Sequence, residues 1–403
     1  MLKNIFFLFL IQISNYIFPL LTLPYLVRVL GASQFGSLML AQALIQYFIT
    51  VTEYGFNLSA TKKIALSKSQ DETNKIYTNT LYARIILALI CFIIAILCTQ
   101  FIEMFEREFN VIIILFLGVI GNCFFPIYLF QGLELMKKIA WISIVSKTFM
   151  TLSVFVLVKD AKDINNAALA LAIPLLLPGI ISFIYIYNRQ LARVVSFSFR
   201  GIVKELKDGG ALFISQIAIS FYTTFNTLIL GYIFNPTIVG VFSAADKLRI
   251  AAQSCYVPIQ QVVFPRINKE AGELSTKLLK YGGFFVLISF LGSSLVFFFG
   301  EQLALLYLGN EFIISARLFK WMSLLLFIIS IAIVFGQWGL ITLGKEKLLT
   351  KIYVIGALCH VGYSIPLVMG YNVYGMLVSV LITEFIITLM MIFSFYKVTH
   401  SAI

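Results

Sequence analysis

The sequence predicts an all-α integral membrane protein with about 12 transmembrane helices, in two six-helix lobes around a central cationic cavity. Three observations predict this class. Apolar residues make up 60% of the 403-residue chain and charged residues 12%, about half of what soluble domains carry. The apolar residues form long runs separated by short, mostly basic loops. Alternating strand patterns are absent, so these runs are helices rather than strands of a barrel.

The apolar runs have the length that a bilayer requires. A hydrocarbon core about 30 Å thick needs roughly 20 helical residues. The runs that qualify are residues 5–26, 37–56, 77–99, 110–131, 141–158, 166–187, 210–233, 239–263, 281–299, 314–341, 352–370 and 375–396. The first run is too long for the core of a signal peptide and lacks a small-residue cleavage site, so we expect it to be retained as a span.

The basic residues of the loops orient these runs. Loops on the N-terminal side hold most of the Lys and Arg, whereas the opposite loops hold only Arg28, Arg107, Lys159 and Lys162. Because cytoplasmic loops carry the excess of basic residues, both termini are predicted to be cytoplasmic. The same asymmetry accounts for the net charge of +12, so nucleic acid is not expected as a partner.

The longest cytoplasmic connection, residues 188–208, falls between the sixth and seventh runs. It mixes apolar and basic residues as an interfacial amphipathic segment does. We therefore predict an N-terminal lobe over 1–187, a linker over 188–208 and a C-terminal lobe over 209–403. Six runs in each half give both halves the same orientation, as in transporters built from parallel repeats with a site near the midplane.

The sequence offers little for catalysis. It has only two histidines, His360 and His400, and its five cysteines lack CxxC spacing, so neither a metal site nor a His-based nucleophile is expected. The stretch GLITLGK at 339–345 has the spacing of a phosphate loop, but Glu346 follows it and no strand precedes it. We predict no catalytic residue, no metal, no cofactor and no enzymatic activity. Transport would be driven by an ion gradient or by the gradient of the substrate.

Ionisable residues inside the predicted runs carry the strongest functional signal. Such residues are costly in a bilayer and usually face a wet cavity or each other. The basic residues outnumber the acidic ones, which predicts an anionic ligand such as phosphate or pyrophosphate. The basic ones are Arg84, Lys147, Lys247, Arg249, Arg317 and Lys320, and the acidic ones are Glu53, Asp246 and Glu384.

Depth separates these residues into two groups. Asp246, Lys247, Arg249 and Glu384 lie roughly 12–14 Å from the start of their runs, near the midplane. The other five lie within about two turns of an interface, where snorkelling to water is the alternative. Asp246 and Arg249 are three residues apart and can form a structural ion pair on one helix face. Lys247 is about 100° away around the helix and has more freedom to face a ligand.

The first run contains Pro19 and Pro24. Proline inside a helix frees a carbonyl group and bends the axis. Gln12, Asn15 and Thr22 are polar residues that can satisfy the freed groups. A bent first helix beside a cavity would serve as a gate, and an ordinary kinked span is the alternative.

Several stretches resemble the Wzx-type O-antigen flippases of the multidrug/oligosaccharidyl-lipid/polysaccharide exporter superfamily. The resemblance covers nearly the whole chain, in the right order and spacing. Its residues are 14–36 (SNYIFPLLTLPYLVRVLGASQFG), 53–65 (EYGFNLSATKKIA), 125–137, 229–249 and 257–267, with Thr383 and Glu384.

The resemblance implies a bacterial inner-membrane protein that moves undecaprenyl-pyrophosphate-linked oligosaccharides from the cytoplasmic to the periplasmic leaflet. A polysaccharide polymerase and a chain-length regulator are implied as partners. Most of the family positions are expected to define the fold rather than contact the ligand. They are Asn15, Pro19, Pro24, Arg28, Gly31, Gly36, Glu53, Gly55, Asn57, Gln131, Gly132, Asp246, Arg266 and Glu384.

Our mechanistic hypothesis is alternating access. In the inward-open state, the pyrophosphate would be held by Lys247 and Arg249 with Arg84 and Lys147. On the outer side, the pyrophosphate would be received by Arg317 and Lys320. Asp246 or Glu384 would bind H⁺ or Na⁺ for coupling, and the gating or structural residues would be Asn15, Pro19, Pro24, Arg28 and Glu53.

One alternative function is a multidrug exporter of similar architecture, which the excess of positive charge in the spans disfavours. The other is a membrane polysaccharide polymerase, disfavoured because the outer loops reach only about a dozen residues.

Overall fold

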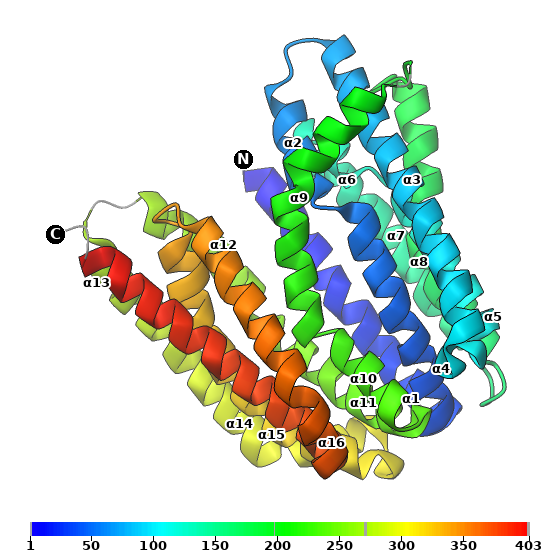
Figure 1. Ribbon diagram of the computed structural model, residues 1–403, viewed down its shortest axis with the longest axis vertical. Helices are drawn as coiled ribbons and strands as arrows, with labels where there is room; N and C mark the ends of the chain where they lie inside the picture. Colours follow the sequence, from blue (N-terminus) through cyan, green and yellow to red (C-terminus); the bar gives the residue numbers. More distant parts are fainter. Residues whose placement is uncertain (1, 197, 270–271, 401–403) are drawn as a thin grey trace. The chain divides into compact units, whose positions relative to one another are not determined.

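The computed structural model describes residues 2–196, 198–269 and 272–400, with side chains from Ser14 onward except that of Lys269. Within these residues the regular structure is entirely helical, and no strand occurs (Figure 1). The terminal residues Met1 and 401–403 lie outside the described part. The prediction of an all-α membrane protein is confirmed.

Among the described residues, eight helical segments are long and apolar enough to cross a membrane. A ninth is counted if α9 (Phe199–Tyr222) and α10 (Phe225–Ile233), which are bent by 41° at their junction, form one broken span. The twelve predicted runs exceed these nine segments for two reasons. Two of the long helices hold two runs each, and the run at 239–263 lies on helices that are too charged or too short to count as a span.

Two long helices account for part of the difference. The first, α1 (Leu2–Glu53), holds run 5–26 and run 37–56 up to residue 53, and α16 (Glu346–His400) covers runs 352–370 and 375–396. Each is interrupted by one residue with non-helical dihedral angles, Gly31 (φ 69°, ψ 171°) and Asn372 (φ 55°, ψ −139°). Glycine adopts this positive φ at little cost because it has no Cβ. Each long helix is therefore two helices joined by a kink.

The run at 239–263 falls on α11 (Pro236–Gln253) and α12 (Tyr256–Lys269). The first of these begins with Pro236 in its first turn, and the Asn235 side chain caps it by accepting a hydrogen bond from the Ile238 amide at 3.2 Å. It carries Asp246, Lys247 and Arg249 within 18 residues, so it is too charged to count as an apolar span by composition. The number of twelve spans stays a prediction.

The chain divides into two compact units, Met1–Ile217 and Ala218–Ile403, and the division falls inside α9. The lobe limits at 187 and 209 stay a prediction. In unit 1, α1 packs against α5 and α7, and α5 and α7 both pack against α8. The remaining helices of this unit are α2 Phe56–Leu66, α3 Gln70–Phe101, α4 Glu103–Glu106, α5 Phe109–Cys123, α6 Ile127–Gly132, α7 Met136–Leu157 and α8 Ile164–Arg189.

A close approach of two backbones joins α5 to α8. A Cβ on Gly121 would lie 2.2 Å from the Leu176 Cα atom, and a Cβ on Gly179 would lie 2.5 Å from the Gly121 carbonyl oxygen. Small residues at such crossings let transmembrane helices pack closely.

In unit 2, α15 packs against α11, α14 and α16, and α16 also packs against η3. Its core includes Phe285, Trp338, Leu340 and Met391. Besides α10, α11, α12, α16 and the end of α9, the unit contains α13 Leu274–Lys277, the π-helix η1 Leu278–Gly282, α14 Gly283–Leu308, the 3₁₀ helix η2 Asn310–Phe312, α15 Ile313–Ala332 and the π-helix η3 Ile333–Leu340.

Candidate functional site

Arg84 lies on α3 in the interior of unit 1, where its side chain is only 1% exposed. Its guanidinium donates to Asn122 Oδ1 at 2.5 Å and to the Phe125 carbonyl oxygen at 3.2 Å. Asn122 in turn donates from Nδ2 to Glu53 Oε1 at 3.3 Å. The structure thus brings two predicted residues, Arg84 and Glu53, into one polar cluster that ties α1, α3 and α5 together.

Lys147 on α7 donates from its ammonium group to Asn15 Oδ1 on α1. These two residues were predicted for different roles, one as a substrate ligand and one as a gating residue. Their contact places a partly buried cation beside the proline-containing part of α1. A neutral amide leaves the positive charge of Lys147 uncompensated by this contact.

The prolines of the first run lie inside α1, and the break in this helix falls at Gly31 rather than at either proline. Thr22 donates to the carbonyl oxygens of Phe18 and Pro19, both at 3.2 Å. Arg28, on the exposed surface of unit 1, lies just before the break. Bending at Pro19 and Pro24 stays a prediction.

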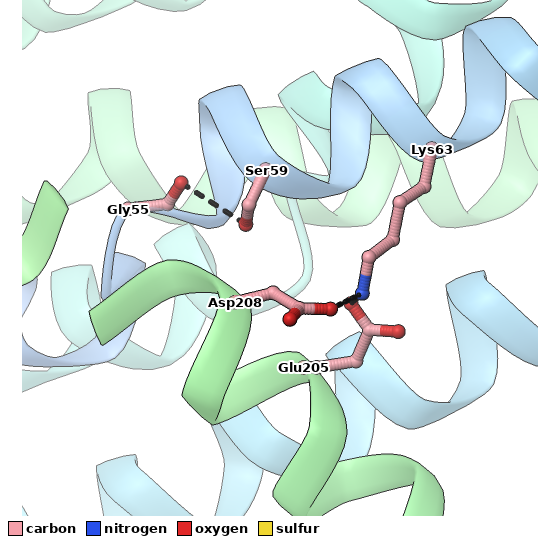
Figure 2. Close-up of polar contacts among 5 residues, drawn as sticks. All are labelled: Gly55, Ser59, Lys63, Glu205 and Asp208. Atoms are coloured by element: carbon pink, nitrogen blue, oxygen red, sulfur yellow. Dashed lines mark hydrogen bonds and ion pairs between the residues drawn. The ribbon is translucent and has the colours of Figure 1, made fainter. Parts of the chain in front are cut away.

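Sequence reasoning missed one polar site of unit 1, which Figure 2 shows between α2 and α9. Lys63 Nζ lies 2.8 Å from Glu205 Oε2 and 2.5 Å from Asp208 Oδ2. Glu205 and Asp208 are three residues apart, so they share one face of α9. That spacing is readable in the sequence, which places both residues in the predicted linker 188–208.

A pocket of about 450 Å³ lies beside this ion pair. Next to it, Tyr54 stacks on Phe213 with ring centroids 4.3 Å apart, and Ser59 donates to the Gly55 carbonyl at 3.3 Å. The ring contact joins the residue just before α2 to α9, and the Ser59 hydrogen bond lies within the first turn of α2. The pocket is lined by Leu58, Ser59, Lys62, Lys63, Leu66, Asp208 and Leu212.

In unit 2, the ion pair expected on α11 is present. Arg249 Nε donates to Asp246 Oδ1 at 2.7 Å, and Arg249 Nη1 donates to Gln253 Oε1 at 2.5 Å. The charges of Arg249 and Glu384 also interact, as do those of Lys247 and Asp246. Asp246 and Arg249 therefore pair on α11, and Glu384 on α16 lies near enough for its charge to interact with that of Arg249.

Arg317 and Lys320 on α15 share one acceptor that sequence reasoning missed. Arg317 Nε lies 3.5 Å from Glu301 Oε1, and Lys320 Nζ lies 3.7 Å from Glu301 Oε2. Lys320 Nζ also lies 5.4 Å from the centroid of the Phe297 ring. Two cations facing one carboxylate leave this group with a net positive charge.

A hydrogen-bonded network around His360 was also missed. His360 on α16 is 0% exposed, and its ring contacts Thr383 Oγ1 at 2.6 Å and Asn226 Oδ1 at 2.7 Å. Asn226 lies on α10, so the network joins two helices of unit 2. The available signal was the lone histidine within a predicted run. Among the residues described, no group of three or more His, Cys, Asp or Glu side chains is placed to hold a metal ion.

Comparison with known proteins gives the family. Residues 1–271 match the family described as Polysaccharide biosynthesis protein. A protein of Shigella dysenteriae named as an O-antigen transporter is 39% identical over 396 residues, which covers 97% of this chain and 99% of that protein. The chain belongs to the polysaccharide biosynthesis protein family.

A second family relative, from Escherichia coli strain K12, is also named as an O-antigen transporter. It is 33% identical over 402 residues, covering 97% of this chain and 95% of that protein. These matches confirm the resemblance to O-antigen flippases that the quoted stretches indicated.

Solved structures show that this family member has the fold of multidrug/oligosaccharidyl-lipid/polysaccharide superfamily transporters. An inward closed structure of the lipid II flippase MurJ superposes with a TM-score of 0.80 at 14% identity, covering 96% of this chain and 87% of that one. An inward-facing multidrug transporter of this superfamily gives a TM-score of 0.78 at 14% identity, covering 97% and 98%.

The polar groups of the two units can do different things: some can attract an anion, and others contain carboxylates that can bind a proton or a cation. In unit 1, Lys147 contacts the neutral amide of Asn15, and in unit 2 Arg317 and Lys320 share one carboxylate, so both groups carry positive charge. Both can attract a phosphate-type anion. The Asp246, Arg249 and Glu384 group instead contains carboxylates whose protonation or ion binding would change the balance of charge.

Proposed function

We propose that the protein is a flippase that carries a lipid-linked polysaccharide repeat unit of the O-antigen class across a bacterial cytoplasmic membrane. The observation that carries this proposal is the near-full-length identity of 39% to a protein named as an O-antigen transporter. The fold shared with a lipid II flippase supports a lipid-linked substrate. The function is transport rather than catalysis, since both relatives are named as transporters.

The substrate lipid is undecaprenyl pyrophosphate in this proposal, and the mechanism is alternating access. Lys147, Lys247 and Arg249 hold the pyrophosphate in the inward-open state, and Arg317 and Lys320 receive it on the outer side. We assign Arg84 to positioning, because its guanidinium donates to Asn122 and to the Phe125 carbonyl inside unit 1.

Coupling to an ion gradient is part of the same proposal. Asp246 and Glu384 are the coupling carboxylates, supported by the interaction of each with Arg249. Both termini lie in the cytoplasm, and a polymerase and a chain-length regulator act on the delivered repeat units.

The test is complementation of a bacterium that lacks its own O-unit flippase and carries the glycan gene cluster cognate to this protein. Restored surface polysaccharide is the expected result, with membrane insertion verified in the same cells. Well-inserted protein without surface polymer would contradict the proposal. Growth of the same cells in the presence of toxic organic cations tests the drug-exporter alternative. That alternative predicts resistance to the cations without any surface polymer.

The cations are tested in the complemented strain. Lys147→Ala and Lys247→Ala, each with normal insertion, should lower surface polymer by at least about tenfold, since one lost charge-assisted contact is worth about 1.5–3 kcal/mol. Lys62→Ala, an exposed cation outside the proposed set, is the matched control and should leave export unchanged.

A further inference from the structure

The charged group of Glu301, Arg317 and Lys320 lies in the seam between α14 and α15, near one end of both helices. Glu301 precedes the end of α14, and the two cations follow the start of α15. At 1.5 Å per residue, all three lie about 6–10 Å inside these ends. The sequence predicts this end on the outer side of the membrane. Lysine and arginine side chains at such a depth are long enough to reach the headgroups of the lipids.

The hydrogen-bond donors of the two cations are only partly used. Arg317 Nε lies 3.5 Å from Glu301 Oε1, and Lys320 Nζ lies 3.7 Å from Glu301 Oε2. Both separations exceed the range of about 2.7–3.2 Å for an N–H···O hydrogen bond. A guanidinium carries five N–H groups and an ammonium three, so one carboxylate at these distances leaves most donors for another acceptor. A phosphate-type anion, which has several acceptor oxygens, matches this surplus of donors and of positive charge.

The surface beside the cations is aromatic and exposed. Phe298 on α14 is 70% exposed, and Trp321 on α15 is 46% exposed. The ring of Phe297 contacts both, with centroids 5.6 Å from Phe298 and 5.3 Å from Trp321. Lys320 Nζ lies 5.4 Å from the centroid of the same Phe297 ring. The cations and the exposed rings therefore share one surface of the helix pair.

This surface belongs to a peripheral helix of unit 2. Helix α14 packs against α15 and the short helices η1 and η2, and within the described residues of this unit it makes no other extensive helix contact (Figure 1). Exposed apolar side chains recur along one of its faces, at Leu287, Leu291, Leu295, Phe298 and Leu306. An exposed apolar face on a membrane-spanning helix is covered by lipid chains. An anion that meets Arg317 and Lys320 on this surface therefore arrives from the bilayer.

We propose that this seam binds the pyrophosphate of a polyprenyl carrier lipid from the bilayer side, before the lipid leaves into the outer leaflet. The phosphate oxygens contact Arg317 and Lys320, and the polyprenyl chain lies on Phe298 and Trp321. The sugar extends into water beyond the helix ends, so the seam recognises the carrier with or without sugar. This inference rests on the proposed function and adds the direction from which the receiving site is reached.

Glu301 makes this binding reversible. Its carboxylate competes with the phosphate oxygens for the same donors, and its negative charge repels them. The two cations and the carboxylate therefore have opposite effects on the affinity for the lipid. Removing Arg317 and Lys320 should weaken binding, whereas removing the charge of Glu301 should strengthen it.

The test measures whether the carrier lipid shields Trp321 from a quencher in the bilayer. Of the three tryptophans in the chain, Trp338 is buried, and Trp141 and Trp321 are exposed. The full-length Trp141→Phe protein is placed in nanodiscs of brominated phosphatidylcholine, whose chains quench Trp321. Undecaprenyl pyrophosphate without sugar, added at a few mole per cent, should restore most of the emission. Undecaprenol, which has the chain but no phosphate, should not restore it.

Charge variants in the same background give opposite shifts. Arg317→Gln combined with Lys320→Gln should raise the carrier concentration for half restoration by at least about tenfold. Glu301→Gln should lower it by about twofold to fivefold, as removal of an exposed competing ion pair does. The Trp321→Phe protein, which retains Trp141 of unit 1 as its exposed tryptophan, is the matched control. The carrier should leave its emission unchanged.

Four results separate the explanations. Equal restoration by undecaprenol, or by phosphatidylglycerol at the same mole fraction, would overturn the proposal, because the seam would then recognise a chain alone or any anionic headgroup. A half-restoration concentration that the glutamine variants leave unchanged would also overturn it. Shielding of Trp321 in a protein that exports no polymer would contradict the proposed function and leave the lipid site standing. Export by a protein whose Trp321 is never shielded would do the reverse.

Discussion

The two units use their membrane-embedded polar residues in different ways. In unit 1, Arg84 reaches neutral amide and carbonyl groups, and its link to Glu53 passes through Asn122. In unit 2, Arg249 pairs directly with Asp246, and a buried histidine joins two helices. The comparison teaches that an ionisable residue within a span can be held by neutral groups alone, as Arg84 is, or by a direct charge partner, as Arg249 is. The two arrangements differ in what is left unpaired when one partner is removed.

The largest effect should come from removing the cation that holds unit 1 together. Arg84→Met breaks two charge-assisted hydrogen bonds and leaves Asn122 Oδ1 and the Phe125 carbonyl oxygen without their donor, which should destabilise the protein by about 3–5 kcal/mol. Denaturation in mixed detergent micelles measures this free energy. Arg200→Met, at an exposed position of the same unit, is the control. A loss below about 1 kcal/mol would show that Arg84 is not a packing residue.

The second prediction compares glycines of the two units. Gly121→Ala in unit 1 would place Cβ against the Leu176 backbone, whereas Gly336→Ala in unit 2 would meet the Met391 sulfur at 2.6 Å. A flexible methionine can move and a helix backbone cannot, so the unit 1 variant should lose about 1–3 kcal/mol more. Equal losses in the same denaturation experiment would contradict this difference.

The third prediction concerns the direct ion pair of unit 2. Arg249→Ala leaves Asp246 without its partner, so adding Asp246→Asn should recover part of the lost stability. We expect a coupling energy of about 1–2 kcal/mol from the double-mutant cycle. Strict additivity would show that the pair contributes nothing to folding.

A smaller effect is expected at the ion pair between α2 and α9. Lys63 is 24% exposed and Asp208 is 40% exposed, so solvent and salt screen their contact, whereas Glu205 is only 5% exposed. Lys63→Met should cost about 1–2 kcal/mol, because it leaves the buried Glu205 without its cation, and the part due to Asp208 should shrink in high salt. Lys62→Met is the matched control, since Lys62 forms no ion pair with the residues described. A loss that is independent of salt would point to packing of the lysine stem.

The smallest effect is at Asp163, in the loop between α7 and α8. Hydrogen bonds from the amides of Lys159 and Asp160 lower the pKa of its carboxyl below the usual 3.8. A lowered folded-state pKa stabilises the protein above pH 3.8, and this contribution disappears as pH falls through the folded value. In the Asp163→Asn variant, the thermal midpoint should therefore fall less steeply than that of wild type as pH drops below 4. Above pH 4, the midpoints of the two proteins should change with pH in parallel. A curve identical to that of wild type would contradict the shift.

The sequence by itself determined the membrane class, the apolar runs and the family, and it predicted the pair of Asp246 and Arg249. These depend on local properties: hydrophobicity accumulates along a run, and residues three apart share one face of any helix. The sequence predicts more spans than the structure has long helices. One reason is that the chain is helical on both sides of the kinks at Gly31 and Asn372, so two predicted spans lie on one long helix in each case.

Only the tertiary structure decided the partners across helices. It joined Arg84 to Asn122, Lys147 to Asn15, and Arg317 and Lys320 to Glu301. It also placed Asn226 against His360, 134 residues away in the chain. Helical periodicity fixes which residues share a face, but it does not say which other helix will cover that face. The roles of these polar groups depend on which helix covers the face that carries them, and tertiary packing decides this.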